Sequence, residues 1–127
     1  MIEASIQAFN DENWDALERL WEPDGMMVGP PAWPESGDIV GWPAIRAQFQ
    51  RLKADWREDH IRIEEMEEAA PGTFLVRMRW TVTGAASELP FDVPMWMVAR
   101  IRDGRYFRAD YFQEEQPARA AAEATAR

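Results

Sequence analysis

The residues best suited to chemistry in this sequence lie near its C-terminal end. A carboxylate, Asp110, alternates along the chain with Tyr106, Arg108 and Phe112. In an extended strand these side chains share one face, so Asp110 would follow its aromatic neighbours into an apolar interior. A desolvated carboxylic acid has a raised pKa, which suits it to proton transfer near neutral pH. We therefore predict that Asp110 is a catalytic acid or base. The alternative is that Arg108 neutralises it in a structural ion pair.

The other ionisable residues give weaker signals. His60 is the only histidine and lies in the acidic segment WREDHIRIEE, which predicts an exposed position. Asp92 is expected on a solvated or dimer-facing surface, and Asp24 in a turn after Pro23. With one histidine and no cysteine, a zinc or iron site is not expected. The sequence has no glycine-rich phosphate loop and no nucleophile elbow, so we expect neither a metal nor another cofactor.

Hydrophobic periodicity predicts the elements that must position Asp110. Apolar residues recur at three- and four-residue steps over 2–21 and again from Pro43 to Trp56, which predicts amphipathic helices. The first stretch is interrupted where Asp11 or Asn13 could cap a second helix. The period then changes to two, which predicts antiparallel strands, and Asp-Gly at 103–104 predicts a hairpin. The four longer strands are expected at 60–68, 73–83, 91–102 and 105–113, and two short ones at 26–28 and 38–40.

Segregation of the helices from the longer strands indicates an α+β fold. We predict a cone-shaped, curved antiparallel sheet wrapped around two to three N-terminal and central helices. Methionines on the inner face of such a cone are flexible fillers, typical of an adaptable pocket. The residues predicted to bind a ligand lie on the inner strand faces or in the loop above them. They are Met27, Trp33, Trp42, Met78, Trp80, Met95, Met97, Tyr106, Arg108 and Phe112.

Two tryptophans lie in the stretch 29–42, whose prolines and glycines exclude a helix or a continuous strand. Large aromatic side chains in such a loop must cover either a core or the mouth of a cavity. We predict that Trp33 forms a lid over the hollow. Trp42, beside the expected helix start, is predicted to plug the core.

Composition limits the class of protein. A chain of 127 residues is the size of one domain, and we place that domain at 1–116, with 117–127 as a short helix or a disordered end. The formal net charge of −9 disfavours nucleic acid and anionic membrane surfaces as partners. No apolar run is long enough to span a bilayer, and no signal peptide is evident. The expected location is the cytoplasm.

The face of the sheet opposite the hollow is predicted to support self-association. Trp96 and Val98 share this face on one strand, and Arg77 and Arg79 share it on the preceding strand. A large exposed aromatic side chain is typical of an interface. We expect a homodimer through these four residues.

Three stretches of the sequence carry a resemblance to a known family. They are AFNDENWDALERLWEPDG, PPAWPESGDIVGWPAIRAQF and the hairpin WMVARIRDGR. Together they resemble the SnoaL-like branch of the nuclear transport factor 2-like superfamily, which includes ketosteroid isomerases and polyketide cyclases. The resemblance covers residues 2–122 and implies a cone that holds a ligand, in a homodimer paired through the outer sheet face. It also implies an acidic residue in the closing strand, at Asp110.

The sequence differs from the isomerase branch of the family, because no clear motif here matches the catalytic tyrosine and carboxylates of the isomerases. The first helix expected in this sequence also begins later than is usual in the family. Two hypotheses follow. One is a cofactor-independent isomerase, cyclase or hydratase that encloses a small hydrophobic or aromatic molecule and uses Asp110. The other is a non-catalytic binding or dimerisation module, in which the pocket contains no buried titrating carboxylate. A further possibility is that the fold serves as a scaffold for engineered chemistry.

Overall fold

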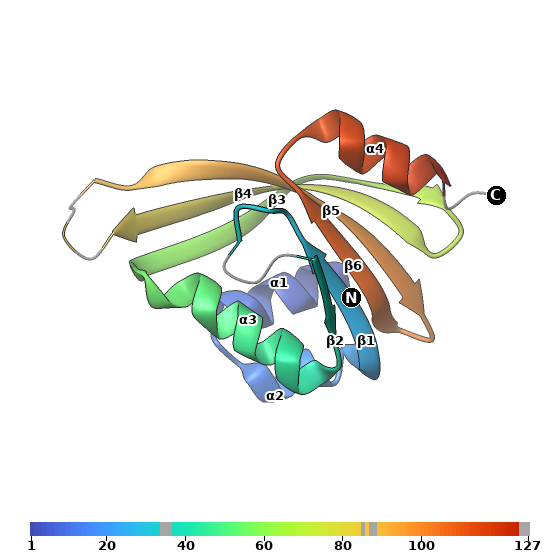
Figure 1. Cartoon of the computed structure of the whole chain (residues 1–127), viewed down its shortest axis with the longest axis horizontal. Helices are drawn as coiled ribbons and strands as arrows, with labels where there is room; N and C mark the ends of the chain where they lie inside the picture. Colours follow the sequence, from blue (N-terminus) through green and yellow to red (C-terminus); the bar gives the residue numbers. More distant parts are fainter. Residues whose placement is uncertain (34–36, 85, 87–88, 125–127) are drawn as a thin grey trace.

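The fold is described from a computed structural model that covers residues 1–33, 37–84, 86 and 89–124. Helices α1 (Ile2–Asn10), α2 (Trp14–Glu18) and α3 (Trp42–Ala54) lie on one face of a single sheet, and α4 (Glu115–Ala124) lies on the other (Figure 1). The strands are β1 (Trp21–Gly29), β2 (Gly37–Val40), β3 (Trp56–Ala70), β4 (Thr73–Gly84), β5 (Phe91–Arg102) and β6 (Arg105–Phe112). The predicted α+β class is confirmed.

The N-terminal arm forms two helices because the chain breaks its helical hydrogen bonding at residues 11–13. The side chain of Asn13 accepts a hydrogen bond from the backbone N–H of Ala16, which caps α2. Helix α3 begins at Trp42 and carries Pro43 in its first turn, where a missing N–H costs nothing. Within the described ranges, no helix is long and apolar enough to cross a membrane.

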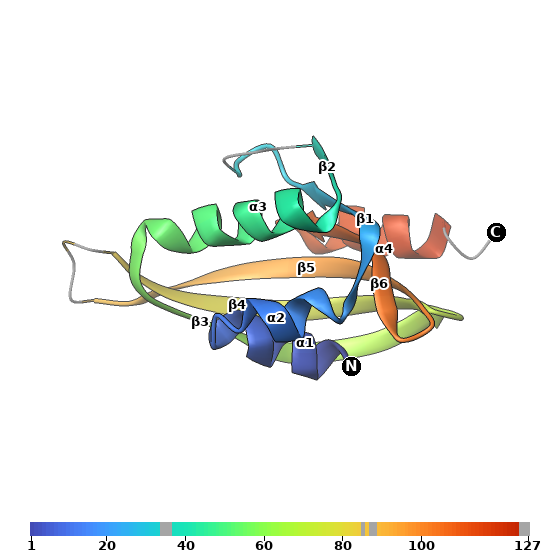
Figure 2. The ribbon, with the colours of Figure 1, turned by 90° about the horizontal axis from the view of Figure 1, so that it is seen from below.

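The sheet has the strand order β2-β1-β6-β5-β4-β3. Strands β3 to β6 form the antiparallel meander that the sequence predicted. Strand β1 pairs with β6 in parallel, a non-local contact that hydrophobic periodicity does not report. The turn expected at Pro23 and Asp24 lies inside β1, where the register shifts between Trp21 and Met26. Irregularities of this kind bend a strand and increase its twist, and the sheet is curved (Figure 2).

The curved sheet therefore has two different faces. We call the face toward α1, α2 and α3 the concave face, and the face toward α4 the convex face. The concave face carries the main hydrophobic core, which includes the predicted inward rows of β4 and β5. The convex face carries a smaller cluster in which Leu75 and Val98 pack against Ala118 and Ala122 of α4. Helix α4 begins just before the domain boundary predicted at 116.

Candidate functional site

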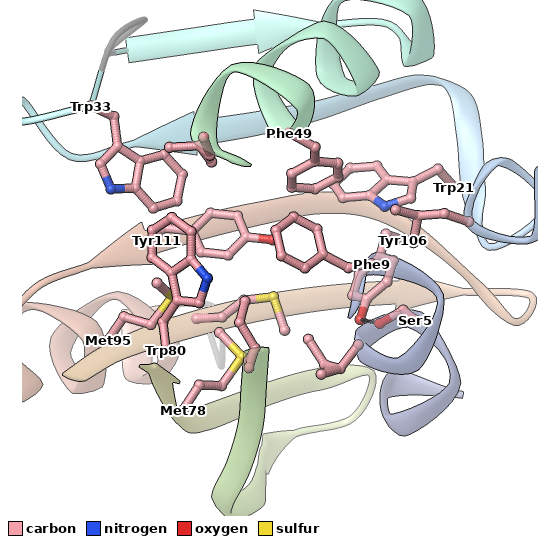
Figure 3. Close-up of a pocket in the computed structure, with 15 residues that line it drawn as sticks. Ser5, Phe9, Trp21, Trp33, Phe49, Met78, Trp80, Met95, Tyr106 and Tyr111 are labelled. Atoms are coloured by element: carbon pink, nitrogen blue, oxygen red, sulfur yellow. Dashed lines mark hydrogen bonds between the residues drawn. The ribbon is translucent and has the colours of Figure 1, made fainter. Parts of the chain in front are cut away.

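A small cavity lies between the concave face and the three helices, and Figure 3 shows its lining. Its volume is about 40 Å³, and apolar and aromatic side chains from α1, α2, α3, five strands and the loop at Trp33 dominate the lining. An apolar cavity of about 150 Å³ holds one benzene ring. A ligand with an aromatic ring therefore fits only if side chains move. The lining residues are Ser5, Ile6, Phe9, Leu17, Trp21, Trp33, Phe49, Leu52, Ile61, Met78, Trp80, Met95, Met97, Tyr106 and Tyr111.

At one end of the cavity the polar groups bond to one another. The Ser5 hydroxyl donates to the carbonyl oxygen of Ile2 at 2.7 Å and also contacts the Tyr106 hydroxyl. Because a carbonyl can only accept, Ser5 has no proton left for Tyr106, so Tyr106 must donate to Ser5. Burial raises the pKa of Tyr106 well above its usual range, and the hydrogen bond to Ser5 offsets only part of that rise. Tyr106 therefore stays neutral and its proton is already committed.

Near the mouth, Tyr111 and Trp33 lie against each other with ring centroids 5.1 Å apart. The Tyr111 hydroxyl points into the cavity (Figure 3). Within the described part of the chain, no protein group accepts its proton, nor those of the indole N–H groups of Trp21 and Trp33. Burial raises the pKa of Tyr111 strongly, so it remains a neutral donor. Among the residues that the structure describes, the lining thus offers free donors and no carboxylate.

A buried ion pair supports the wall of the cavity from behind. Lys53 of α3 donates to both carboxylate oxygens of Asp59, at 3.0 and 2.9 Å. Their side chains are only 7% and 10% exposed. Asp59 also accepts the indole N–H of Trp80 at 3.0 Å, and the Lys53 ammonium lies 4.3 Å from the Phe9 ring centroid. Because Lys53 and Trp80 satisfy the carboxylate, Asp59 can be buried beside an apolar pocket.

Asp110 does not lie in the cavity, and the predicted shared face with Tyr106 is wrong. The register pairs Ile101 with Tyr106 but Arg100 with Arg108, so Phe107 is one extra residue in β6. One inserted residue reverses the faces of every residue that follows it. Tyr106, Ala109 and Tyr111 therefore face the concave side, and Asp110 faces the convex side.

On the convex side Asp110 is held by two arginines. Arg108 donates to both of its oxygens, at 2.7 and 3.0 Å, and Arg100 donates to one at 2.9 Å. Arg108 and Phe112 share this face with Asp110, away from the cavity, and Phe112 packs against the cluster under α4. The alternative expected from the sequence, a structural ion pair between Asp110 and Arg108, is the arrangement that the structure contains.

The other predicted ligand-binding residues divide into two groups. Met27 and Trp42 are buried in the main core but do not line the cavity, which agrees with the core-plug expectation for Trp42. Those that do line it are Trp33, Met78, Trp80, Met95, Met97 and Tyr106. Tyr111 was not predicted to line the cavity, because the alternating pattern does not indicate the extra residue at Phe107 that turns Tyr111 toward the concave side. The helical lining residues, such as Ser5, were missed because only the packing angle of α1 brings them to the strands.

The predicted dimer residues share the convex face but differ in exposure. Arg77 and Arg79 are partly exposed and bind Glu64 across the sheet. Trp96 is partly buried. Val98 is fully buried beneath α4, so its expected availability to a second chain is wrong.

The remaining ionisable groups lie outside the cavity. Asp92 is exposed, accepts a hydrogen bond from Thr81 at 2.8 Å and lies 3.8 Å from Arg79. His60 and Asp24 are both exposed. Among the described residues no cluster of three or more His, Cys, Asp or Glu side chains could hold a metal ion.

Comparison with known protein families identifies the class of protein to which this fold and pocket belong. The SnoaL-like domain family matches residues 2–109, and the chain belongs to this family. The sequence matches no curated protein.

Three solved structures illustrate the likeness in fold. TerC, co-crystallised with polyporic acid, is 17% identical with a TM-score of 0.78, covering 97% of this chain and 95% of its own. A protein of ketosteroid isomerase-like fold from Catenulispora acidiphila, in complex with trimethylamine, is 20% identical with a TM-score of 0.76, over 97% and 91%. Bal32a, from a soil-derived mobile gene cassette, is 20% identical with a TM-score of 0.77, over 87% and 84%. At these identities the likeness concerns the fold alone.

Proposed function

We propose that this protein binds a small, neutral, hydrophobic or aromatic molecule in the concave cavity. The observation that carries the proposal is a lining of apolar and aromatic side chains in which no described residue is charged. Such a lining favours an uncharged ligand, because an ion buried there would have no partner. The free donors of Tyr111 and the two indoles favour a ligand with at least one hydrogen-bond acceptor, such as a carbonyl oxygen.

Binding must be accompanied by movement of the lining. Three methionines, Met78, Met95 and Met97, line the cavity, and their unbranched side chains change rotamer at low cost. Trp33 covers the mouth from a loop and is only partly buried. These side chains can enlarge a volume of about 40 Å³ without moving the sheet.

The test uses acetophenone and its isostere 2-phenylpropene, in which a methylene group replaces the oxygen. With methyl-labelled methionine, we expect saturable shifts in the resonances of Met78, Met95 and Met97. The exposed Met66 on β3 serves as the internal control and should not shift. We expect Tyr111→Phe to weaken acetophenone binding about tenfold and to leave 2-phenylpropene unchanged. Absence of saturable shifts with both probes would overturn the proposal.

The proposal favours the binding module over the acid–base enzyme, because the carboxylate predicted for chemistry is held by arginines on the opposite face. Asp110→Asn separates the two. If any reaction is found for this protein, we expect Asp110→Asn to retain it, with a loss of stability instead. Loss of turnover in a variant that remains folded would restore the catalytic role of Asp110.

We further propose that a second copy of the chain pairs with the convex face beside α4. There Arg62, Arg77 and Arg79 alternate with Glu64, Glu65 and Asp92 in ion pairs of 3.0–3.8 Å. Three positive and three negative groups make this patch neutral in a chain of net charge −9. Two copies repel each other least at this patch, and a two-fold axis can match its alternating charges. Trp96→Glu should give a monomer by light scattering, and an unchanged dimer would place the interface elsewhere.

A further inference from the structure

The apolar concave row of β5 continues beyond the cavity. Met97 and Met95 line the cavity and are buried, Val93 is partly buried, and Phe91 is 53% exposed. All four side chains share one strand face, so the row runs from the interior to the solvent without changing direction. Strands β4 and β5 extend past the C-terminal end of α3 in both views (Figures 1 and 2). The outer part of the row therefore lies where that helix no longer covers the sheet.

A second series of aromatic rings follows the same path from the cavity outward. Trp80 lines the cavity and meets Trp56 edge to face, with ring centroids 6.1 Å apart. Trp56 in turn meets Phe91 at 5.6 Å, also edge to face. These three rings come from β4, β3 and β5, and the register places Val93 directly opposite Trp80. The wall of the cavity is thus continuous with an exposed aromatic surface.

The dimensions make this outer surface relevant to a ligand. The cavity holds about 40 Å³, whereas Met95 and Phe91 are four residues apart on an extended strand, or about 13 Å. A molecule larger than a single ring must therefore leave the cavity through its mouth. The apolar surface that continues from the cavity wall is the row of Val93, Phe91 and Trp56.

We propose that Val93, Phe91 and Trp56 form an outer subsite for the apolar chain of an elongated ligand. This inference rests on the proposed function, because the polar, ring-bearing end of the ligand lies in the cavity. The ligand class is a neutral ring compound with a hydrogen-bond acceptor and an attached alkyl or aryl chain. The occupant is assigned to the ligand because the row is continuous with the cavity wall and shares its strand face.

The experiment measures affinity against chain length with a series of phenyl alkyl ketones: acetophenone, butyrophenone and hexanophenone. Burial of a methylene group strengthens binding up to about fourfold, and we expect about twofold per methylene on a surface that covers one side of the chain. Phe91→Ala should flatten this dependence while leaving the affinity for acetophenone unchanged. Phe91 is largely exposed, so the variant is expected to fold.

Val40→Ala is the matched control, because Val40 is also an exposed apolar residue, 61% exposed, and lies on the edge strand β2, three strands away from β5. This variant should keep the dependence on chain length. If acetophenone binds but longer ketones gain nothing, or if Phe91→Ala keeps the gain, the subsite is overturned and the cavity proposal stands. If no ketone binds, the cavity proposal fails and the subsite fails with it. A change in self-association on Phe91→Ala, with the chain-length gain intact, would assign the surface to a second copy and overturn the subsite.

Discussion

The two faces of the sheet differ in how their buried charged groups are paired. On the concave face one carboxylate, Asp59, is bound by Lys53 and Trp80 behind an aromatic wall. On the convex face the ionic groups form a network across neighbouring strands, and Asp110 is bound by two arginines. The concave face therefore keeps its ion pair out of a hollow, whereas the convex face combines a buried ion pair at Asp110 with a partly exposed network. We therefore assign the proposed neutral ligand to the concave face and the proposed second chain to the convex face.

The comparison predicts the largest effect at the buried concave ion pair. Lys53→Met leaves the carboxylate of Asp59 buried without its cation, and the expected loss of unfolding free energy is about 3–5 kcal/mol. Urea unfolding followed by tryptophan fluorescence measures the loss. The double variant Lys53→Met, Asp59→Leu removes both charges and should recover most of the stability. A single variant as stable as the parent would mean that Asp59 is solvated.

A pair of methionines tests the difference in packing between the core and the rim. Met78 is fully buried on the concave face, and Met66 is exposed on the edge strand β3. Met78→Ala should cost about 2–5 kcal/mol, since it removes buried contacts and leaves a cavity. Met66→Ala should cost less than about 0.5 kcal/mol. Equal shifts in the urea midpoint would show that the methionines around the cavity are not packed.

Alkaline pH tests the polar end of the cavity. The chain has two tyrosines, Tyr106 and Tyr111, and burial raises the pKa of both. In the unfolded chain they ionise near pH 10, while in the folded chain they keep their protons. The unfolded state then binds fewer protons, so stability is fully present below about pH 10 and falls above it. Tyr106, the more buried of the two, should contribute up to about 1.4 kcal/mol per pH unit.

The measurement is urea unfolding between pH 9 and 12, together with the ultraviolet absorbance of tyrosinate. Tyr106→Phe should reduce the alkaline loss of stability. Ionisation of both tyrosines at the usual pH in the folded protein would show that water reaches the cavity freely.

The smallest effect is expected at the exposed ion pairs that join α4 to the convex face. Arg119 binds Glu67 of β3 at 2.9 Å and Glu115 of its own helix at 3.1 Å, and all three side chains are well exposed. Arg119→Met should change the urea midpoint less than Lys53→Met or Met78→Ala, because exposed pairs are screened by solvent. A loss comparable to that of Lys53→Met would mean that Arg119 holds α4 in place.

Several parts of this structure could be predicted from the sequence because they depend on local alternation. The inward rows of β4 and β5, the hairpin at 103–104 and the capped helix α2 all follow from residue types within a few positions of one another. The inward-facing residues of β4 and β5 therefore line the cavity, as their alternation indicates. The sequence could not predict on which side of the sheet Asp110 lies. Strand β6 carries aromatic residues at both odd and even positions, so either alternating set could be the one that faces the core.

The sequence by itself determined most of the segments that become helices and strands, since side-chain periodicity acts over a few residues. The start of β1 is an exception, because residues expected in a helix and a turn lie in that strand. The tertiary structure decided three further things: the extra residue in β6, the parallel pairing of β1 with β6, and the docking of α4 over Val98. Each depends on contacts between segments far apart in the chain, whose free energy no local pattern records. The extra residue matters most for function, because it moves a carboxylate out of the hollow and puts the hydroxyl of Tyr111 inside it.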